Sequence, residues 1–126
     1  MTSLSLRWRP ERLAVARWSP AHALPALPSG CFFSLTRTDD ELSLVVPAEC
    51  LPDGAEQVEA GWRAAAVIGP LDFSLIGILR GLSSVLADAG ISIFAISTYD
   101  TDLILVREGD QARAESALVA AGYRFT

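Results

Sequence analysis

The sequence is poor in the residue types from which most catalytic and metal centres are built. It has one histidine, His22, and two cysteines, Cys31 and Cys50, which lack the CxxC spacing of metal and redox motifs. His22 lies in a proline-rich connector, which argues against a Ser-His-Asp or Cys-His set, and no pair has metal-ligand spacing. Asp39 and Asp40 are adjacent in a turn, so their carboxylates diverge and hydrolysis is disfavoured. We therefore expect a protein that is not an enzyme and has no metal or cofactor.

Basic stripes and long apolar runs are also missing. The net charge is −5 and the pI is near 4.7, which argues against a nucleic-acid partner. Arg7, Arg9, Arg12 and Arg17 come nearest to a basic stripe, and we interpret them as a solvated face. The sequence shows no signal peptide and no stretch apolar enough to span a bilayer. A cytoplasmic protein with reduced thiols and no membrane partner is the expectation.

The clearest structural pattern runs from Gly69 to Val106. Asp72 has the residue type of a helix N-cap, and Gly90 that of a left-handed C-cap. Between them, apolar residues recur at helical spacing, namely Leu75, Ile78, Leu79, Leu82, Val85 and Leu86. We predict a helix at about 73–89, a strand at 91–98, a turn at 99–101 and a strand at 103–106.

Weaker patterns predict the remaining elements. Strands are expected at 4–8, 13–18, 31–36, 42–46 and 62–68. Ala55–Ala60 predicts a short helix that Gly61 stops, and Asp110 is expected to cap a second helix that ends at Ala121. A last short strand is expected at 123–125. Three prolines between residues 20 and 28 leave room for at most one helical turn before the strand at 31–36.

An internal repeat indicates how these elements combine. A shift of 61 residues superposes two apolar hairpins without a gap, with Phe33 on Phe94 and Val45 on Val106. The chain is therefore predicted to be α+β, with a degenerate first half at 1–61 and a complete ferredoxin-like βαββαβ half at 62–126. Both faces of the second hairpin are apolar, so one face must meet the first half or another subunit. We expect a homodimer; packing within one chain is the alternative.

The residues resemble a known family in three stretches. These are Gly-Pro-Leu-Asp-Phe-Ser-Leu-Ile-Gly-Ile-Leu at 69–79, Leu-Ala-Asp-Ala-Gly-Ile-Ser-Ile-Phe at 86–94, and Ile-Ser-Thr-Tyr-Asp-Thr-Asp-Leu-Ile-Leu-Val at 96–106. The pattern resembles the ACT domain, and within it the CASTOR-like branch of arginine sensors and their small bacterial relatives. The resemblance implies a regulatory module that binds a free amino acid beside a module or subunit interface. The ligand-binding positions that it implies are Gly69, Asp72, Phe73, Ser74, Leu75, Thr98, Tyr99 and Asp102.

The chemistry of these residues agrees with that expectation but leaves alternatives open. A helix starting near Phe73 would offer N–H donors and a positive dipole end to a carboxylate. Asp72 and Asp102 could bind an ammonium group, and two acids would suit a basic amino acid best. Asp72 could equally be a simple N-cap, Asp102 part of a solvated turn, and Tyr99 a lid or a turn residue. A ligand-free oligomerisation module is the alternative function.

Overall fold

The computed structural model describes residues 4–69 and 76–126, which form two compact units. Unit 1 combines residues 1–10 with 63–126, and unit 2 consists of residues 11–62. We expected halves at 1–61 and 62–126. The units differ from these halves because the first strand of the chain pairs with strands of the C-terminal unit.

Unit 2 is an antiparallel sheet of four strands with the order β3-β4-β2-β5. Its elements are β2 (Leu13–Trp18), β3 (Ser34–Arg37), β4 (Leu42–Pro47), the short 3₁₀ turn η1 (Ala48–Cys50) and the first part of β5 (Gln57–Val67). Relative to the βαββαβ pattern, the strand order is that of a ferredoxin-like fold, with neither helix present.

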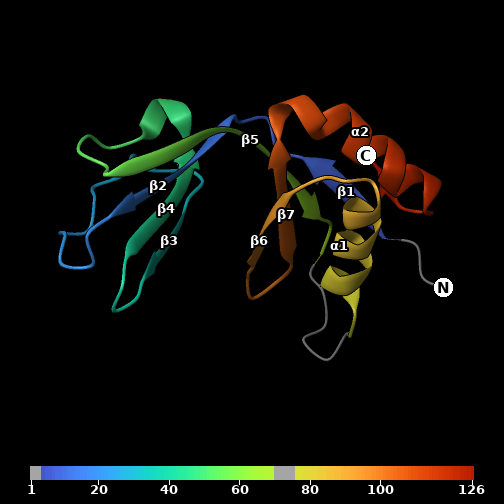
Figure 1. Cartoon of the computed structure of the whole chain (residues 1–126), viewed down its shortest axis with the longest axis horizontal. Helices are drawn as coiled ribbons and strands as arrows, with labels where there is room; N and C mark the ends of the chain where they lie inside the picture. The colour runs from blue at the N-terminus through green and yellow to red at the C-terminus, as the bar shows by residue number, and fades with distance from the viewer. Residues whose placement is uncertain (1–3, 70–75) are drawn as a thin grey trace. The chain divides into compact units, whose positions relative to one another are not determined.

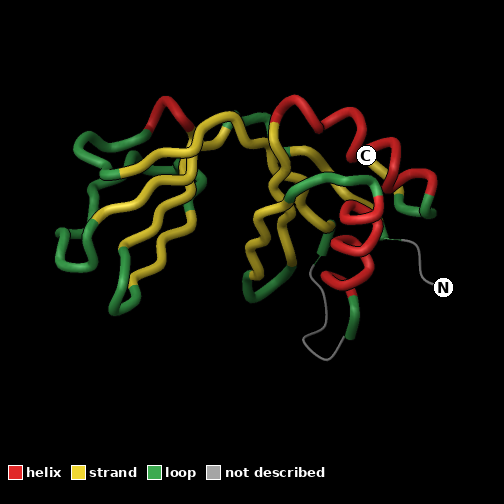
Figure 2. The backbone as a smooth tube through the Cα atoms, in the orientation of Figure 1, coloured by secondary structure: helices red, strands yellow, loops and turns green. Residues whose placement is uncertain are grey.

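Loops take the place of helices over the core of unit 2. Residues 19–33 contain no helix, as the spacing of the prolines predicted (Figure 2). Leu27 and Cys31 from this connector pack against buried residues of the sheet, and so do Cys50 and Leu51 after β4. The buried residues are Ala16, Trp18, Leu42, Leu44 and Val46. Unit 2 is therefore degenerate in its helices, while its sheet is complete.

The helix predicted at 55–60 is wrong, because these residues enter β5. Gln57 to Glu59 pair with Arg17 to Val15 of β2. The register shifts by one residue before Leu13 meets Trp62, and Gly61 in this interval has a φ of 82°. A left-handed glycine in a strand with one extra residue is a β-bulge. Gly61 thus bends the strand, where the sequence analysis had read it as a stop signal.

Unit 1 carries both α-helices of the described residues (Figure 1), and its sheet has the strand order β6-β7-β5-β1-β8. Besides the second part of β5, its elements are β1 (Ser5–Trp8), α1 (Ile78–Asp88), β6 (Ile93–Ser97), β7 (Asp102–Arg107), η2 (Glu108–Asp110), α2 (Gln111–Ala120) and β8 (Arg124–Phe125). The predicted βαββαβ element order is confirmed. One strand is added to it, since β1 lies between β5 and β8, antiparallel to the first and parallel to the second.

Both helices pack on one face of the unit 1 sheet. The shared core consists of Leu6, Ala65, Val67, Leu82, Leu86, Ile91, Ile104, Val106, Ala114 and Leu118. Both helices end as their glycines predicted. Gly90 has a φ of 74°, its N–H bonds Ala87 O at 2.9 Å, and the next N–H bonds Leu86 O at 2.9 Å. This pair of bonds defines a Schellman motif, and Gly122 ends α2 in the same way.

The start of α1 differs from the prediction. Ile76 is not helical, and Gly77 has a φ of 84°, so the helix begins at Ile78 and the predicted start at residue 73 is wrong. A left-handed residue cannot continue an α-helix, and glycine adopts that conformation without a steric penalty. The N-cap residue of α1 is Gly77, and Asp72, which the sequence predicted in that role, lies outside the described residues. Asp110 does precede α2, but its carboxylate bonds Arg113 and does not cap the helix.

The repeat is present in the structure with a period of 60 residues. Leu35 pairs with Leu44 in unit 2, and the residues 60 positions later, Ala95 and Ile104, pair in unit 1. Likewise η1 at 48–50 corresponds to η2 at 108–110. The shift of 61 found in the sequence is therefore one residue out of register. Apolar residues on both faces of the strands allow this slip to pass unnoticed in a sequence comparison.

Candidate functional site

One end of the unit 1 sheet brings together three segments that the sequence analysis assigned to a site. These are the end of β5 at Val67–Gly69, the turn between β6 and β7, and the start of α1 (Figure 1). The hydroxyl of Thr101 donates a hydrogen bond of 2.6 Å to Val67 O. Because this bond is short and partly buried, it fixes the turn against the end of β5. Gly69, which follows, is exposed.

Thr98 shapes this turn. Its N–H bonds Thr101 O at 2.8 Å, and its Oγ1 both accepts from Thr101 N–H at 3.2 Å and donates to Thr101 O at 3.1 Å. The hydroxyl of Thr98 is thus used within the turn, so its role in the structure is to hold the turn's shape. Tyr99 at the tip has 79% of its surface exposed. Asp102 is half-buried and pairs with Ser97 at the base of the hairpin.

The start of α1 provides N–H donors at a different place from the one predicted. The first intrahelical bond runs from Gly81 N–H to Gly77 O at 2.9 Å. The N–H groups of residues 78–80 therefore precede the helical ladder and form the positive end of the helix dipole. Asp72, Phe73, Ser74 and Leu75 lie outside the described residues. Of the predicted positions, the structure places Gly69, Thr98, Tyr99 and Asp102 at the same end of the sheet.

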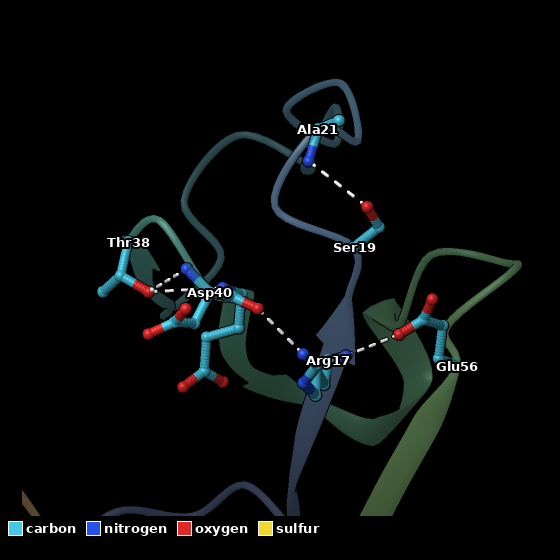
Figure 3. A network of polar contacts seen from close by, with 7 residues as sticks. Arg17, Ser19, Ala21, Thr38, Asp40 and Glu56 are labelled. Atoms are coloured by element: carbon cyan, nitrogen blue, oxygen red, sulfur yellow. Dashed lines mark hydrogen bonds and ion pairs between the residues drawn. The ribbon is translucent and has the colours of Figure 1, made fainter.

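Unit 2 has an equivalent turn between β3 and β4, where polar side chains form hydrogen bonds and an ion pair with one another (Figure 3). Thr38 holds the turn as Thr98 does, accepting from Asp40 N–H at 3.1 Å. Arg17 on β2 donates to Asp40 O at 2.9 Å and forms an ion pair of 2.6 Å with Glu56. A charged side chain with two bonded partners thus stands beside this turn. In unit 1, the corresponding contact to the preceding strand is made by the small hydroxyl of Thr101.

Sequence reasoning missed both anchoring residues. Thr101 was read only as a turn residue, and Arg17 was grouped with the solvated arginines. Each contact joins positions far apart in the sequence, 34 residues for Thr101 and 23 for Arg17, and no local pattern reports such a pairing. The 60-residue period aligns Glu41 with Thr101 and would have directed attention to this position.

Two further features bear on what the described residues can do. No group of three or more histidine, cysteine, aspartate or glutamate side chains among them could hold a metal ion. In residues 4–69 and 76–126, neither helix has the length and apolar character required to cross a bilayer.

Comparison with known families identifies the fold. The ACT domain model matches residues 57–120, just over half of the chain, and the chain belongs to the ACT domain family. A second model, for an N-terminal domain, matches residues 11–54. Together the two matches correspond closely to unit 2 and to the α1–α2 part of unit 1. The α+β, ferredoxin-like fold predicted from the sequence is thereby confirmed.

Two curated relatives belong to the CASTOR group. Human putative protein CASTOR3P is 40% identical over 91 residues, covering 63% of this chain and 56% of the relative. Bovine cytosolic arginine sensor for mTORC1 subunit 1 is 37% identical over 89 residues, covering 63% of this chain and 27% of the relative. The chain thus spans little more than half of the first relative and about a quarter of the second.

Solved structures extend the similarity over both units. A crystal structure of an Agrobacterium tumefaciens protein has a TM-score of 0.90 and 35% identity, covering all of this chain and 94% of the other. Aspartate kinase from Clostridium acetobutylicum has a TM-score of 0.65 and 14% identity, covering 93% of this chain and 34% of the other. At that identity the kinase supports the fold alone.

Proposed function

We propose that the chain is a non-catalytic regulatory module that binds a free amino acid at the end of the unit 1 sheet. The site lies between Gly69, the Thr98–Asp102 turn and the start of α1. N–H groups at the start of α1 bind the carboxylate, and Asp102, together with Asp72, binds the ammonium group. Binding then changes the association or activity of a protein partner.

The main observation in support of this proposal is the Thr101–Val67 hydrogen bond, because it holds the turn between β6 and β7 beside the end of β5. A zwitterion needs both donors and an acid, and this end of the sheet offers donors near residue 78 and the half-buried Asp102. The bovine relative is by its name a cytosolic arginine sensor. That name supports an amino acid ligand, with a basic one as the first candidate, and a cytoplasmic location.

The equivalent end of unit 2 supports one site for each chain. Arg17, bonded to both Glu56 and Asp40, stands beside the turn where unit 1 has only a threonine hydroxyl. A ligand entering there would have to displace an ion pair and a charge-assisted hydrogen bond. We therefore assign amino acid binding to unit 1.

A thermal-shift screen of the twenty amino acids tests the proposal. A ligand at one hundred times its dissociation constant adds about 2.7 kcal/mol to the free energy of unfolding, or about 10 °C in melting temperature for a chain of this size. Asp72→Ala or Asp102→Asn should abolish the shift. Asp100→Asn, which removes the same charge at the exposed tip of the turn, should retain it. If no amino acid raises the melting temperature at millimolar concentration, the proposal is refuted.

An assembly module is the second candidate, favoured by apolar side chains at this same end. Ile76 has 95% of its surface exposed, Tyr99 79% and Ile68 40%. A homodimer that covers them would bury this apolar surface. Light scattering at micromolar concentration should then give a dimer mass that Ile76→Ser lowers. Val119→Ser, at an exposed apolar position of α2, should leave the mass unchanged. A monomer mass for the unmodified chain would refute this candidate.

A further inference from the structure

The helix-free face of unit 1 has a hollow that shares only Gly69 with the proposed amino acid site. The hollow has a volume of about 320 Å³. It is lined by residues of β1 and of the end of β5, namely Arg7, Trp8, Arg9, Pro10, Ala66, Ile68 and Gly69. None of these lining residues is acidic, although the whole chain carries a net charge of −5.

Strand alternation places the two arginines on this face. Leu6 packs in the helix-side core and Trp8 donates a 2.7 Å hydrogen bond to Glu115 of α2, so both side chains point toward the helices. Arg7 and Arg9 alternate with them and point to the opposite face. The strand register sets Arg7 directly opposite Ala66 of β5. Because the side chain of Ala66 is small, space remains beside Arg7 above the two strands, and a larger residue at position 66 would fill that space.

Both arginines line the hollow, and the backbone that carries them is fixed. The N–H of Arg9 bonds Ala64 O at 2.8 Å and its carbonyl accepts from Arg63 at 3.1 Å, which fixes the backbone at this point. Arg7 is exposed, and its contact with the hydroxyl of Thr126 is 3.4 Å, at the long end for a hydrogen bond. Residues two apart on a strand are about 6.6 Å apart, so one small molecule can contact both side chains.

We propose that this hollow is a second ligand site, which takes a small organic anion bearing a carboxylate or phosphate group. The planar guanidinium group matches both anions through paired N–H donors. The floor, formed by Pro10, Ala66 and Ile68, is apolar and suits a short hydrocarbon stem. The volume lies at the lower end of the range for ligand pockets, so a four- or five-carbon dicarboxylate fits and a dinucleotide does not.

This site is distinct from the amino acid site and does not depend on it. Ile104 and Val106 of β7 pack in the core shared with the helices, and Asp102 lies two residues before Ile104 on the same strand. Asp102 therefore belongs to the helix-side face, because neighbouring residues of a strand alternate. The two arginines belong to the opposite face. Gly69 alone borders both.

Nuclear magnetic resonance titration tests the proposal on the full chain. Sodium succinate and sodium phosphate are added separately at matched ionic strength, with sodium chloride and uncharged succinamide as controls. We expect saturable shifts of the Arg7 and Ala66 amides, which border the hollow, with the Tyr99 amide unchanged. Stronger binding of succinate identifies a carboxylate ligand, stronger binding of phosphate identifies a phosphate ligand, and either supports the site. Shifts that do not saturate, or that chloride reproduces, overturn it.

Paired variants separate a formed site from general charge attraction. Arg7→Gln/Arg9→Gln should weaken the apparent Kd at least tenfold, equivalent to about 1.4 kcal/mol. Arg12→Gln/Arg80→Gln removes the same charge at exposed positions outside the hollow and should leave the Kd within twofold. Ala66→Leu keeps both arginines and fills the floor, so it should also weaken binding if the first variant fails to fold. Equal affinity in all three variants overturns the proposal.

Discussion

Gly81 on α1 provides a test of how the helices of unit 1 pack. A Cβ atom added there would lie 2.7 Å from the hydroxyl oxygen of Tyr123. Alanine favours a helix over glycine by about 1 kcal/mol, whereas overpacking of this kind costs about 2 kcal/mol. We therefore expect Gly81→Ala to lower the free energy of unfolding by about 1 kcal/mol, or about 4 °C in melting temperature.

The sign of this effect should reverse when the Tyr123 hydroxyl is removed. In a Tyr123→Phe background the overlap is absent, so Gly81→Ala should raise the free energy of unfolding by about 1 kcal/mol. Urea denaturation followed by circular dichroism measures all four members of the cycle, with an expected coupling energy of about 2 kcal/mol. If Gly81→Ala has the same effect in both backgrounds, the close approach of Tyr123 to α1 does not limit packing and the reasoning is refuted.

Two further predictions concern a helix end and a thiol. Gly90→Ala should lower the free energy of unfolding by about 1–2 kcal/mol in thermal or urea denaturation, because Gly90 has a φ of 74°. Gly109→Ala, where nothing lies within 4 Å of the added Cβ and the backbone is not left-handed, should be neutral. Partial burial, and then the hydrogen bond to Cys50, raise the pKa of the Cys31 thiol above its ordinary value of 9.0. Alkylation of Cys31 by iodoacetamide, followed by peptide mass spectrometry, should therefore have a pH midpoint above that of an unperturbed thiol. A midpoint unmoved by Cys50→Ala would contradict the contribution of the hydrogen bond to Cys50.

The sequence predicted best where a local rule decides the structure. Gly90 and Gly122 were recognised as helix ends because a left-handed cap needs glycine. The hairpins were recognised because β-branched and aromatic residues flank polar turns. The start of α1 was wrong because Asp72 has the right residue type for an N-cap, while the left-handed conformation of Gly77 is not visible in an apolar pattern. The strand through Gly61 was missed because Ala55–Ala60 has helical composition and its pairing with β2 is a tertiary contact.

The common position of four predicted site residues was foreseen, but the contacts that hold this part of the structure were not. Gly69, Thr98, Tyr99 and Asp102 were placed at one end of a sheet, and the described structure has them there. The contact from Thr101 to Val67 holds this end of unit 1, and the contact from Arg17 to Glu56 lies beside the equivalent turn of unit 2. Neither contact joins residues that a periodicity relates. Arg7 and Arg9 were interpreted as solvated because their alternation shows that they share a face. The hollow on that face lies beside Ala66, a small residue that pairs with Arg7 on the neighbouring strand.

The position of β1 between β5 and β8 has a consequence for synthesis of the chain. Ser5 and Leu6 leave the ribosome well before their parallel partners Arg124 and Phe125, which come 119 residues later in the sequence. Unit 2, at residues 11–62, is contiguous and can fold while unit 1 is still incomplete. Its pairing of Leu13 with Trp62 closes the long loop that separates β1 from β5. Unit 2, which has no α-helix, would then hold β1 close to β5 in the nascent chain before β8 has been made.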